Sequence, residues 1–388
     1  MKFSSGNSGS EQIDLSVVIV TFNCLPFVRL CLHSLLWKQE DRMEVIVVDN
    51  NSQDEITSVL IKEFPKVTII ANKKNVGFGT ACNQGMKIAR GRYFLMLNPD
   101  TFVPEDLTQR VVAFMDTHSR CGAMGVRMLD GRGHFLPESK RGLPTLFRSF
   151  CRFSGLSSLF PKSKILAGYY MGHLPADETA AVEILSGAFM VLRREAIEKV
   201  GGFDEIFFMY GEDIDLSWRI HQSGFVNYYE PNISIVHFKG ESTAKDQRYV
   251  KMFYGAMELF YNKHFGGKRR GIIQNIVLVM IEVLGFLSWL RHLLPCKTQV
   301  DSSYLLKKND IDVLLKKSEK LINKDNIVDA VSAETCILDA DSWRPSKILD
   351  FVRIKGFFCK RLIWLGPKKK TVFYPVSSSN KTIISNLD

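Results

Sequence analysis

The side chains that could do chemistry in this chain are carboxylates and one histidine that stand at the ends of apolar runs. Asp49 and Asp100 lie at or just beyond such runs. Asp213 opens an amphipathic segment, and His237 closes a late apolar run. Carboxylates and imidazoles hold divalent cations, and a carboxylate can take the proton from an attacking hydroxyl. Together these groups suit the transfer of a group from a nucleoside diphosphate, because a divalent cation stabilises the charge of that leaving group.

An alternation of strands and helices positions these residues. The predicted strands are continuous apolar runs, as expected for parallel strands that are covered on both faces. We predict strands at 15–21, 44–48, 67–71 and 93–97, helices at 27–38 and 107–117, and the end of a further helix at 83–89. Ligands bind open α/β sheets at the carboxyl ends of the strands. The rhythm therefore predicts a doubly wound α/β sheet with Asn23, Asp49 and Asp100 at one edge.

The second half of the chain is less uniform. Residues 131–180 are rich in Gly, Pro, Ser and aromatic residues, which predicts a long loop or lid. Regular structure is then expected at 182–192, in helices at 194–200, 212–221 and 247–265, and in late strands at 225–230 and 233–237.

Composition and charge limit the class of protein. The hydrophobic content of 46% and charged content of 24% are globular values, which excludes wholesale disorder. Residues 266–388 carry 21 of the 51 Lys and Arg but 12 of the 41 Asp and Glu. This basic part indicates a polyanionic partner or simply a solvated face. No nucleic-acid module accompanies the charge, so we expect anionic lipid and no nucleic acid. The eight cysteines form no CxxC pair, which favours a reducing compartment.

Six segments of the chain together resemble family 2 glycosyltransferases, which are inverting enzymes with the GT-A fold. The segments are VVIVTFN at 17–23, VIVVDNNSQD at 45–54, NVGFGTACNQG at 75–85, FLMLNPDT at 94–101, SGAFMVLRREAIEKVGGFDEIFFMYGEDIDLSWRIHQSGF at 186–225 and HFKGES at 237–242. The NPD and GEDIDLSWR forms are most similar to the rhamnosyltransferase branch that decorates cell-surface polysaccharides. The resemblance spans residues 15–245 and implies a Rossmann-like, mostly parallel sheet flanked by helices.

This resemblance implies that a nucleotide-sugar donor binds along the strand-end edge. Asp49 would accept a hydrogen bond from a uracil or thymine ring, and the local alternative is an Asx turn. Glycines at 77 and 79 would let the backbone approach a ligand, and the alternative is a turn into a helix. The implied donor-binding residues are Thr21, Phe22, Asn23, Asp49, Asn75, Gly77, Asn83, Asn98 and Asp100.

The segment Asn98-Pro99-Asp100 takes the place of the Asp-x-Asp metal motif of the family, with the first carboxylate replaced by an amide. The resemblance implies that Asp100 and His237 bind a divalent cation, Mg²⁺ or Mn²⁺, on the diphosphate.

Asp213 is the expected catalytic base, at a helix start where the helix dipole favours negative charge. The local alternative is an N-cap. A single base predicts one in-line attack with inversion at the anomeric carbon. Glu212, Asp215 and Arg219 are expected to serve the acceptor side or to support the site, with Asp215 and Arg219 as an i,i+4 pair.

The expected organisation has four parts. Residues 1–12 are predicted to be disordered, 13–265 to form the transferase domain and 266–325 to form a basic, apolar helical extension; no role is assigned to 326–388. The apolar stretch 272–294 fits a membrane-surface helix or a core-packing helix equally well. We expect a peripheral protein on the cytoplasmic face of the cell membrane. Its expected partners are a dTDP- or UDP-sugar, a polyprenyl-diphosphate-linked saccharide and an anionic membrane surface, with dTDP-rhamnose as the first donor.

Three other classes of protein fit the sequence less well. A nucleotidyltransferase should carry a Gly-rich phosphate loop after the first strand, and Phe22-Asn23-Cys24 stands there instead. A processive polysaccharide synthase should show several spans of about 20 apolar residues. The sequence does not contain several such spans, so the addition of a single sugar is preferred. A catalytically dead nucleotide- or membrane-binding scaffold is favoured only by Asn98, whereas the retained Asp100, Asp213 and His237 oppose it.

Overall fold

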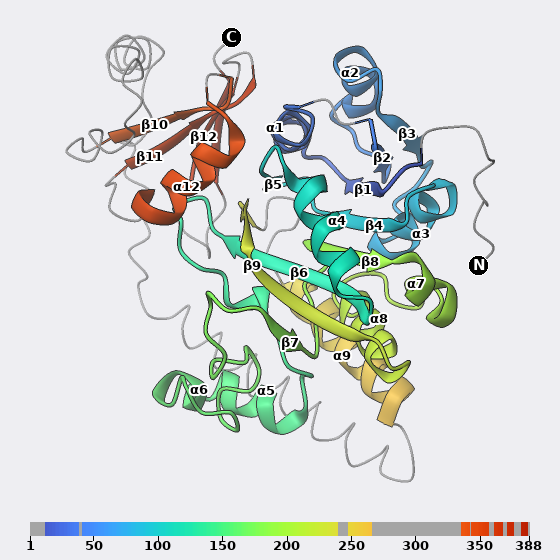
Figure 1. Cartoon of the computed structure of the whole chain (residues 1–388), viewed down its shortest axis with the longest axis vertical. Helices are drawn as coiled ribbons and strands as arrows, with labels where there is room; N and C mark the ends of the chain where they lie inside the picture. Colours follow the sequence, from blue (N-terminus) through green and yellow to red (C-terminus); the bar gives the residue numbers. More distant parts are fainter. Residues whose placement is uncertain are drawn as a thin grey trace.

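The computed structural model describes residues 12–38, 41–239, 247–265, 335–341, 343–356, 361–367, 371–375 and 382–386 (Figure 1). The predicted disordered segment 1–12, apart from its last residue, lies outside these ranges. The predicted helical extension at 266–325 also lies outside them. Both therefore stay predictions.

A mixed β-sheet forms the centre of the molecule. Its described strands are β1 (Leu15–Thr21), β2 (Met43–Asp49), β3 (Thr68–Ala71), β4 (Tyr93–Leu97), β5 (Thr101–Phe102), β6 (Cys121–Leu129), β7 (Ala180–Val182), β8 (Phe189–Arg193) and β9 (Val226–His237). The order is β3-β2-β1-β4-β8-β6-β9-β5, with β7 paired to β9. Strands β3, β2, β1 and β4 are parallel, as predicted, and β8 runs antiparallel between β4 and β6.

Helices cover both faces of this sheet. They are α1 (Leu25–Leu35), α2 (Ile56–Glu63), α3 (Phe78–Ile88), α4 (Leu107–Thr117), α7 (Arg194–Val200), α8 (Glu212–Gln222) and α9 (Gln247–Phe265). Alternate residues of a strand point to opposite faces. Val17 accordingly shares a buried cluster with Val28 of α1 and Val111 of α4, whereas Val18 shares one with Met86 of α3 and Leu216 of α8. The predicted α/β layering is confirmed.

Two predicted segments are organised differently. The predicted strands 225–230 and 233–237 form one strand, β9, whose register against β6 shifts between Val126 and Arg127. Pro231 lies within this shift, and a bulge accommodates it because proline cannot donate a ladder hydrogen bond. The segment 182–192 is divided between β7 and β8. The predicted loop 131–180 contains the short helices η1 (Pro137–Ser139), α5 (Leu146–Phe153) and α6 (Leu156–Leu159).

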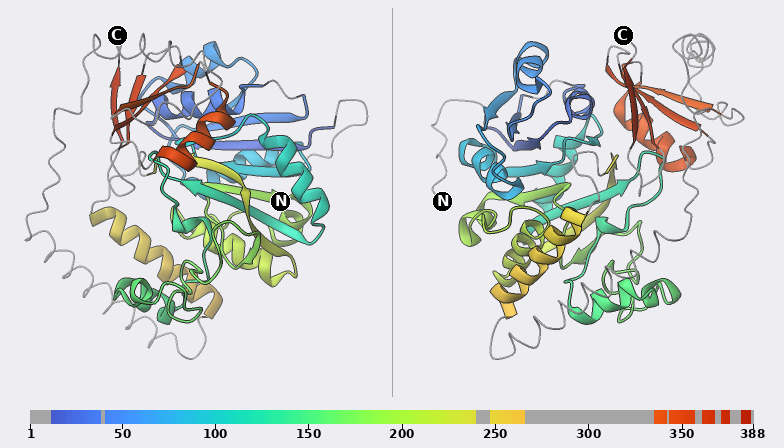
Figure 2. Two further views of the ribbon diagram at one scale, coloured as in Figure 1. Left: turned by 60° about the vertical axis from the view of Figure 1, so that its left-hand side comes forward. Right: turned by 180° about the vertical axis from the view of Figure 1, so that it is seen from behind.

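The described part of 326–388 folds into a small α/β unit that packs on the main sheet. It consists of β10 (Thr335–Asp339), α12 (Pro345–Lys355), β11 (Arg361–Leu365), β12 (Thr371–Tyr374) and β13 (Ile383–Asn386), with the strands in sequence order. Figure 2 shows this unit beside α1 in two views. The ring of Trp364 lies 5.3 Å from that of Phe102 and 5.1 Å from that of Phe238. The unit therefore covers β5 and the end of β9.

Polar contacts add to this packing. The Trp364 indole Nε1 donates a hydrogen bond of 3.0 Å to the Gly131 carbonyl. The backbone nitrogen and the hydroxyl of Ser346 both donate to the Glu105 carboxylate, each at 2.7 Å.

None of the helices in the ranges that the structure describes is both long and apolar enough to cross a bilayer.

We predict that Trp364→Ala lowers the free energy of unfolding by about 3–5 kcal/mol, because it opens a cavity in a fully buried aromatic cluster. Trp364→Phe should cost less, since it keeps a ring and loses mainly the bond to Gly131. Urea denaturation measures both. Ile354→Ala, at a position 52% exposed on α12, is the matched control and should change stability by no more than about 0.5 kcal/mol. Equal losses of unfolding free energy for Ile354→Ala and Trp364→Ala would contradict the packing of the C-terminal unit on the main sheet.

Candidate active site

Strand pairing brings Asp100 and His237 together. Residue Thr101 of β5 pairs with His237 of β9 in an antiparallel register. The Asp100 carbonyl accepts a hydrogen bond of 2.9 Å from the backbone nitrogen of Phe238. The Asp100 Oδ1 consequently lies 3.2 Å from the His237 Nε2, and both side chains are buried. The two residues that the resemblance paired are adjacent in the fold.

This pair suits two positions on a hard divalent cation. Two ligands about 2.1 Å from an octahedral ion, on adjacent vertices, are about 3 Å apart. The observed separation of 3.2 Å is close to that value. In the described part of the chain no three His, Cys, Asp or Glu side chains gather as a metal cage. A cation held here would complete its shell with water and substrate oxygens, as Mg²⁺ commonly does.

Asn98 stands beside this pair. Its side-chain Nδ2 lies 3.3 Å from the His237 Nε2. Its backbone nitrogen donates to the Ala188 carbonyl at 2.9 Å. The amide that replaces the first carboxylate of the metal motif therefore faces the same imidazole nitrogen as Asp100 does.

Asp213 lies in the first turn of α8 and holds three hydrogen bonds. Its Oδ2 accepts from the backbone nitrogen of Gly187 at 3.1 Å and from the Arg141 guanidinium, with which it forms an ion pair. Its Oδ1 accepts from the backbone nitrogen of Ile214 at 2.8 Å. Since Gly187 and Ala188 are consecutive, one turn bonds both Asp213 and Asn98. The candidate base and the candidate metal pair thus belong to one site.

Arg141 is a site residue that sequence reasoning did not identify. It comes from the predicted loop 131–180 and also donates to the Leu185 carbonyl at 2.6 Å. The charge of Asp213 raises the pKa of this guanidinium, although burial acts in the opposite direction. The only signal in the sequence is its place in a basic stretch, because residues 139–176 contain six Lys and Arg and no Asp or Glu.

Glu212, the neighbour of Asp213, has a different environment. Its side chain is buried and its Oε2 accepts from the Gly211 backbone nitrogen at 2.9 Å. Burial raises the pKa of the Glu212 carboxyl to about 8, and the charge of Asp213 adds to the effect. Burial therefore favours the protonated form of Glu212, whereas Asp213 forms an ion pair with Arg141.

Asp215 and Arg219 form the predicted i,i+4 pair, with 2.7 Å between Arg219 Nε and Asp215 Oδ2. Sequence reasoning missed their other partners. The Asp215 Oδ1 also meets Lys263 Nζ at 2.6 Å and His264 Nε2 at 2.7 Å, both from α9. Figure 2 shows α9 lying along α8. The fully buried Asp215 therefore joins two helices, which is a supporting role.

The predicted donor edge carries Thr21 and Asp49 side by side, because they are register partners in β1 and β2. The Asp49 carboxylate accepts from the Ser52 backbone nitrogen at 3.1 Å and from the Thr57 hydroxyl at 3.3 Å. The Asx-type turn that was the local alternative is thus present. The Ser52 hydroxyl also donates to Asp49 Oδ1 at 2.5 Å, so three donors already bind the carboxylate. Of its about four lone-pair sites, about one is left for a ligand. Phe22 is half-buried beside this edge.

Asn23 and Asn75 bind neighbouring backbone. Asn23 has a left-handed φ of 50°, and its Oδ1 accepts from the Gln53 nitrogen at 2.7 Å. Asn75 Oδ1 accepts from the Gly77 nitrogen at 3.0 Å. Both side chains thus shape turns at the strand-end edge.

Gly77 and Asn83 have structural partners that differ from the expected ligand. A Cβ on Gly77 would lie 2.7 Å from the Phe208 carbonyl oxygen, so the close approach that this glycine permits is to residue 208. Asn83 donates to the Phe203 carbonyl at 2.8 Å and accepts from its nitrogen at 2.9 Å. Both residues therefore anchor the segment before α8.

Further polar residues at this edge were also missed. Asn72, which follows β3, donates to the Asn50 side chain at 3.0 Å and to Gln84 at 2.9 Å. Asn50 in turn donates to the Gly77 carbonyl at 3.2 Å. The position of Asn72 directly after a strand was the available signal.

The fold and this site define a GT-A glycosyltransferase, and comparison with known proteins agrees. A family model described as "Glycosyl transferase family 2" matches residues 16–201. An N-acetylglucosaminyl-diphospho-decaprenol L-rhamnosyltransferase of Mycobacterium tuberculosis is 30% identical over 243 residues, which cover 60% of this chain and 78% of the relative. The chain belongs to glycosyltransferase family 2.

More distant similarities were also found. A poly-beta-1,6-N-acetyl-D-glucosamine synthase of Staphylococcus aureus is 24% identical over 57% of this chain and 49% of the relative. The mannosyltransferase PcManGT from Pyrobaculum calidifontis, solved with GDP-Man and Mn²⁺, has a TM-score of 0.45 at 19% identity and 72% coverage of each chain. Residues 1–349 of S. aureus TarS with UDP-GlcNAc have a TM-score of 0.46 at 17% identity, covering 90% of this chain and 89% of that one.

We predict that the protonation of Glu212 makes stability depend on pH. A carboxyl whose pKa is raised by folding keeps a proton that the unfolded chain has released, so stability falls as pH rises between the ordinary value of 4.5 and about 8. Relative to Glu212→Gln, the wild type should lose up to about 1.4 kcal/mol per pH unit in this window. Urea denaturation at pH 5, 6, 7 and 8 measures the difference. The exposed Glu195→Gln is the control, and parallel curves for all three proteins would refute the assignment.

Proposed function

We propose that this chain is an inverting, metal-dependent glycosyltransferase that moves one sugar to a hydroxyl of a polyprenyl-diphosphate-linked saccharide. The proposed donor is dTDP-rhamnose, and the second candidate is a UDP-sugar carrying galactofuranose, glucose or GlcNAc. The observation that carries the proposal is the contact of 3.2 Å between Asp100 and His237 at the strand-end edge. The name of the M. tuberculosis relative, a rhamnosyltransferase that acts on a decaprenyl-diphosphate-linked GlcNAc, supports the choice of donor and acceptor.

The proposed metal site consists of Asp100 Oδ1 and His237 Nε2. A divalent cation, when bound, stabilises the negative charge that develops on a departing nucleoside diphosphate. Asn98, whose amide lies beside the imidazole, would donate a hydrogen bond to the diphosphate. Burial of both ligands strengthens their electrostatic interaction with the cation.

Asp213 is the proposed base. Its Oδ2 is occupied by Arg141 and Gly187, whereas Oδ1 holds one backbone hydrogen bond. A carboxylate oxygen has two lone pairs, so Oδ1 keeps one for the acceptor hydroxyl. The neighbouring Glu212 carries a proton near neutral pH and does not compete as a base. One base supports one in-line displacement with inversion.

The nucleobase would lie against Thr21 and Phe22, with Asp49 as its hydrogen-bond acceptor. Because uracil and thymine present the same edge, Asp49 does not select between UDP and dTDP. Asn23 and Asn75 would hold the surrounding turns, as their backbone contacts support. A polyprenyl-linked acceptor places the reaction at the cytoplasmic membrane surface, where the chain would be peripheral.

We predict that Mn²⁺ strengthens the binding of dTDP or UDP and that Asp100→Ala and His237→Ala each weaken this metal-dependent binding at least about tenfold. Calorimetry with dTDP, UDP, GDP and ADP, with and without Mn²⁺, measures the effect and identifies the base. Asp41→Ala, at an exposed carboxylate before β2, is the control and should bind as the wild type does. Folded protein that binds none of the four nucleotides would refute the donor site.

We predict that Asp213→Asn lowers kcat by about 10²- to 10⁴-fold while nucleotide affinity stays within about twofold, because the amide cannot accept the proton. A radiolabelled dTDP-rhamnose assay with a polyprenyl-diphosphate-GlcNAc acceptor measures the rate, and UDP-sugars run in parallel. The exposed Asp177→Asn is the matched control. Unchanged turnover of Asp213→Asn would remove the residue as base. A wild type that binds nucleotide yet transfers no sugar would favour the scaffold alternative, to which Asn98 points.

A further inference from the structure

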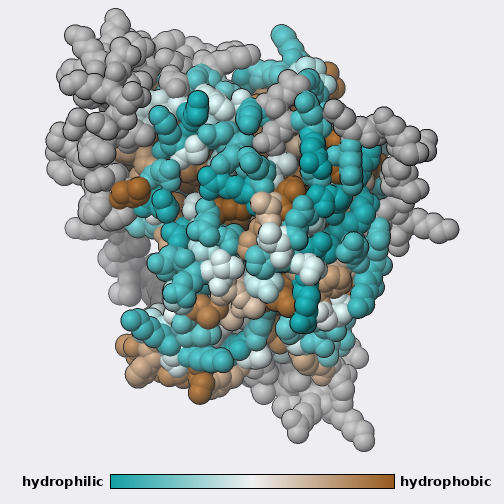
Figure 3. All heavy atoms as spheres, in the orientation of Figure 1, coloured by the Kyte–Doolittle hydropathy of each residue, from teal (hydrophilic) through white to brown (hydrophobic). Residues whose placement is uncertain are grey.

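The densest group of exposed large apolar side chains lies on one lobe of the molecule, formed by α5, α6 and the segment that follows. Of the 13 large hydrophobic residues that are exposed among the described ones, five lie between 147 and 165. They are Phe147, Phe150, Leu159, Phe160 and Ile165, which are 52–73% exposed. Figure 3 shows hydrophobic surface gathered at the lower left, where Figure 1 draws α5 and α6. A contiguous apolar patch on a soluble surface marks an interaction site.

Contacts inside the protein hold this lobe in place. Its exposed residues therefore lie on a folded surface. Thr145 caps α5 by accepting from the Arg148 nitrogen at 3.2 Å. Within α5, Cys151 is fully buried and Ser149 nearly so. The Tyr261 hydroxyl of α9 donates to the Pro144 carbonyl just before the helix. Gly155, with a φ of 85°, lets the chain turn sharply from α5 into α6.

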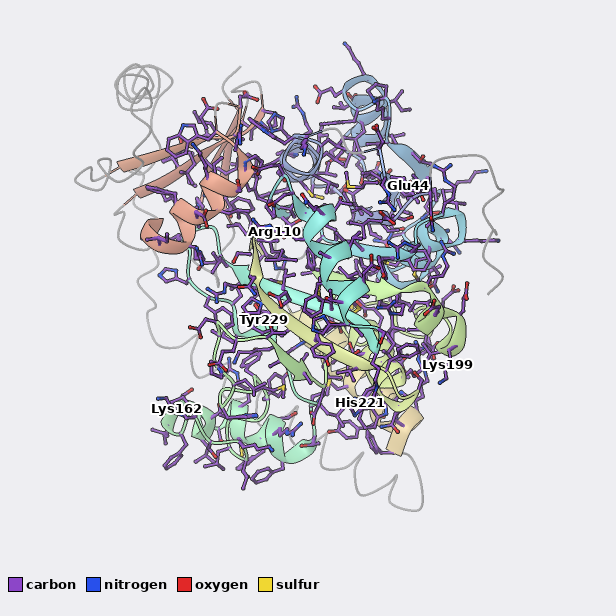
Figure 4. The ribbon with its side chains drawn as sticks, in the orientation of Figure 1. Glu44, Arg110, Lys162, Lys199, His221 and Tyr229 are labelled. Carbon is purple, nitrogen blue, oxygen red and sulfur yellow. The ribbon has the colours of Figure 1, made fainter. Side chains whose placement is uncertain are left out.

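The charge of the lobe indicates which partner the apolar surface fits. Residues 139–176 contain six Lys and Arg and no Asp or Glu. Arg148 is paired with Glu183, and Arg141 with Asp213. Lys162 and Lys164 are exposed and form no ion pair with any residue that the structure describes. Figure 4 places Lys162 on this lobe beside α6. Apolar side chains interleaved with unpaired cations suit the headgroup region of an anionic bilayer.

We propose that the α5–α6 lobe docks this protein on an anionic lipid bilayer. The inference rests on the proposed function, because the reason for docking on a bilayer is that the proposed acceptor is linked to a lipid. Arg141 lies five residues before Leu146, the first residue of α5, and contacts the proposed base Asp213. Docking of the lobe would therefore hold the acceptor side of the site next to the membrane surface. Phe147, Phe150, Leu159 and Ile165 insert among the headgroups, and Lys162 and Lys164 contact lipid phosphate.

Co-sedimentation of the full-length protein with vesicles tests this proposal. The vesicles contain phosphatidylcholine mixed with the anionic lipid phosphatidylglycerol, or phosphatidylcholine alone. The variants are Leu159→Ser/Ile165→Ser and Lys162→Glu/Lys164→Glu. The matched controls lie on α2 and the loop after it: Ile61→Ser, at a position 61% exposed, and Lys62→Glu/Lys66→Glu.

The wild type should bind the anionic vesicles, and both lobe variants should bind them at least about tenfold more weakly. High salt should weaken the wild type, and the α2 controls should bind as it does. Lobe variants that bind like the wild type would overturn the proposal. The proposal would also be overturned if the wild type forms a dimer and the lobe variants are monomers, because a second copy of the chain would then cover the patch. Calorimetry of dTDP and UDP with Mn²⁺, run on the same variants, reports the donor site separately. A protein that docks through the lobe but binds no nucleotide would refute the proposed function alone.

Discussion

The pairing of β5 with the end of β9 is the contact on which the candidate active site depends. It places Thr101 opposite His237 and so brings the Asp100 carboxylate to the imidazole. β5 is only two residues long, and so short a strand is weakly held by its own hydrogen bonds. Phe102 and Phe238, which follow the two site residues, are buried against Trp364 of the C-terminal unit. That unit therefore belongs to the framework of the site, although it lies far away in the sequence.

The second constraint is the turn at Gly187 and Ala188. The Gly187 nitrogen donates to the Asp213 side chain, and the Ala188 carbonyl accepts from the Asn98 backbone nitrogen, so this one turn holds both residues in place. The same region separates the chemistry of two adjacent carboxyl groups. Burial and the charge of Asp213 raise the pKa of Glu212, whereas Asp213 forms an ion pair with Arg141. Two neighbours in sequence thus acquire different electrostatic surroundings, which is a common way to divide roles in an active site.

Much of the fold was predictable because its signals are local. The apolar runs at β1 and β4 and the helical spacing of α4 gave the bounds observed in the structure. Parallel strands end at a common edge, so Asp49 and Asp100 could be placed there in advance. Gly77 shows where such reasoning stops. Its close neighbour is the backbone of Phe208, and no pattern around residue 77 indicates that contact.

The order of residues alone was enough to predict the α/β rhythm and the edge that carries the polar residues, and to nominate Asp100, Asp213 and His237 as site residues. The folded chain was needed to show that Arg141 pairs with Asp213, that Lys263 and His264 converge on Asp215, and that the described strands and helix of the C-terminal unit pack over β5 and the end of β9. These two kinds of information differ in the sequence distance over which they act. Periodicity and strand ends are properties of neighbouring residues, whereas ion pairs and burial depend on segments that the folded chain brings together from distant positions without any repeating signal.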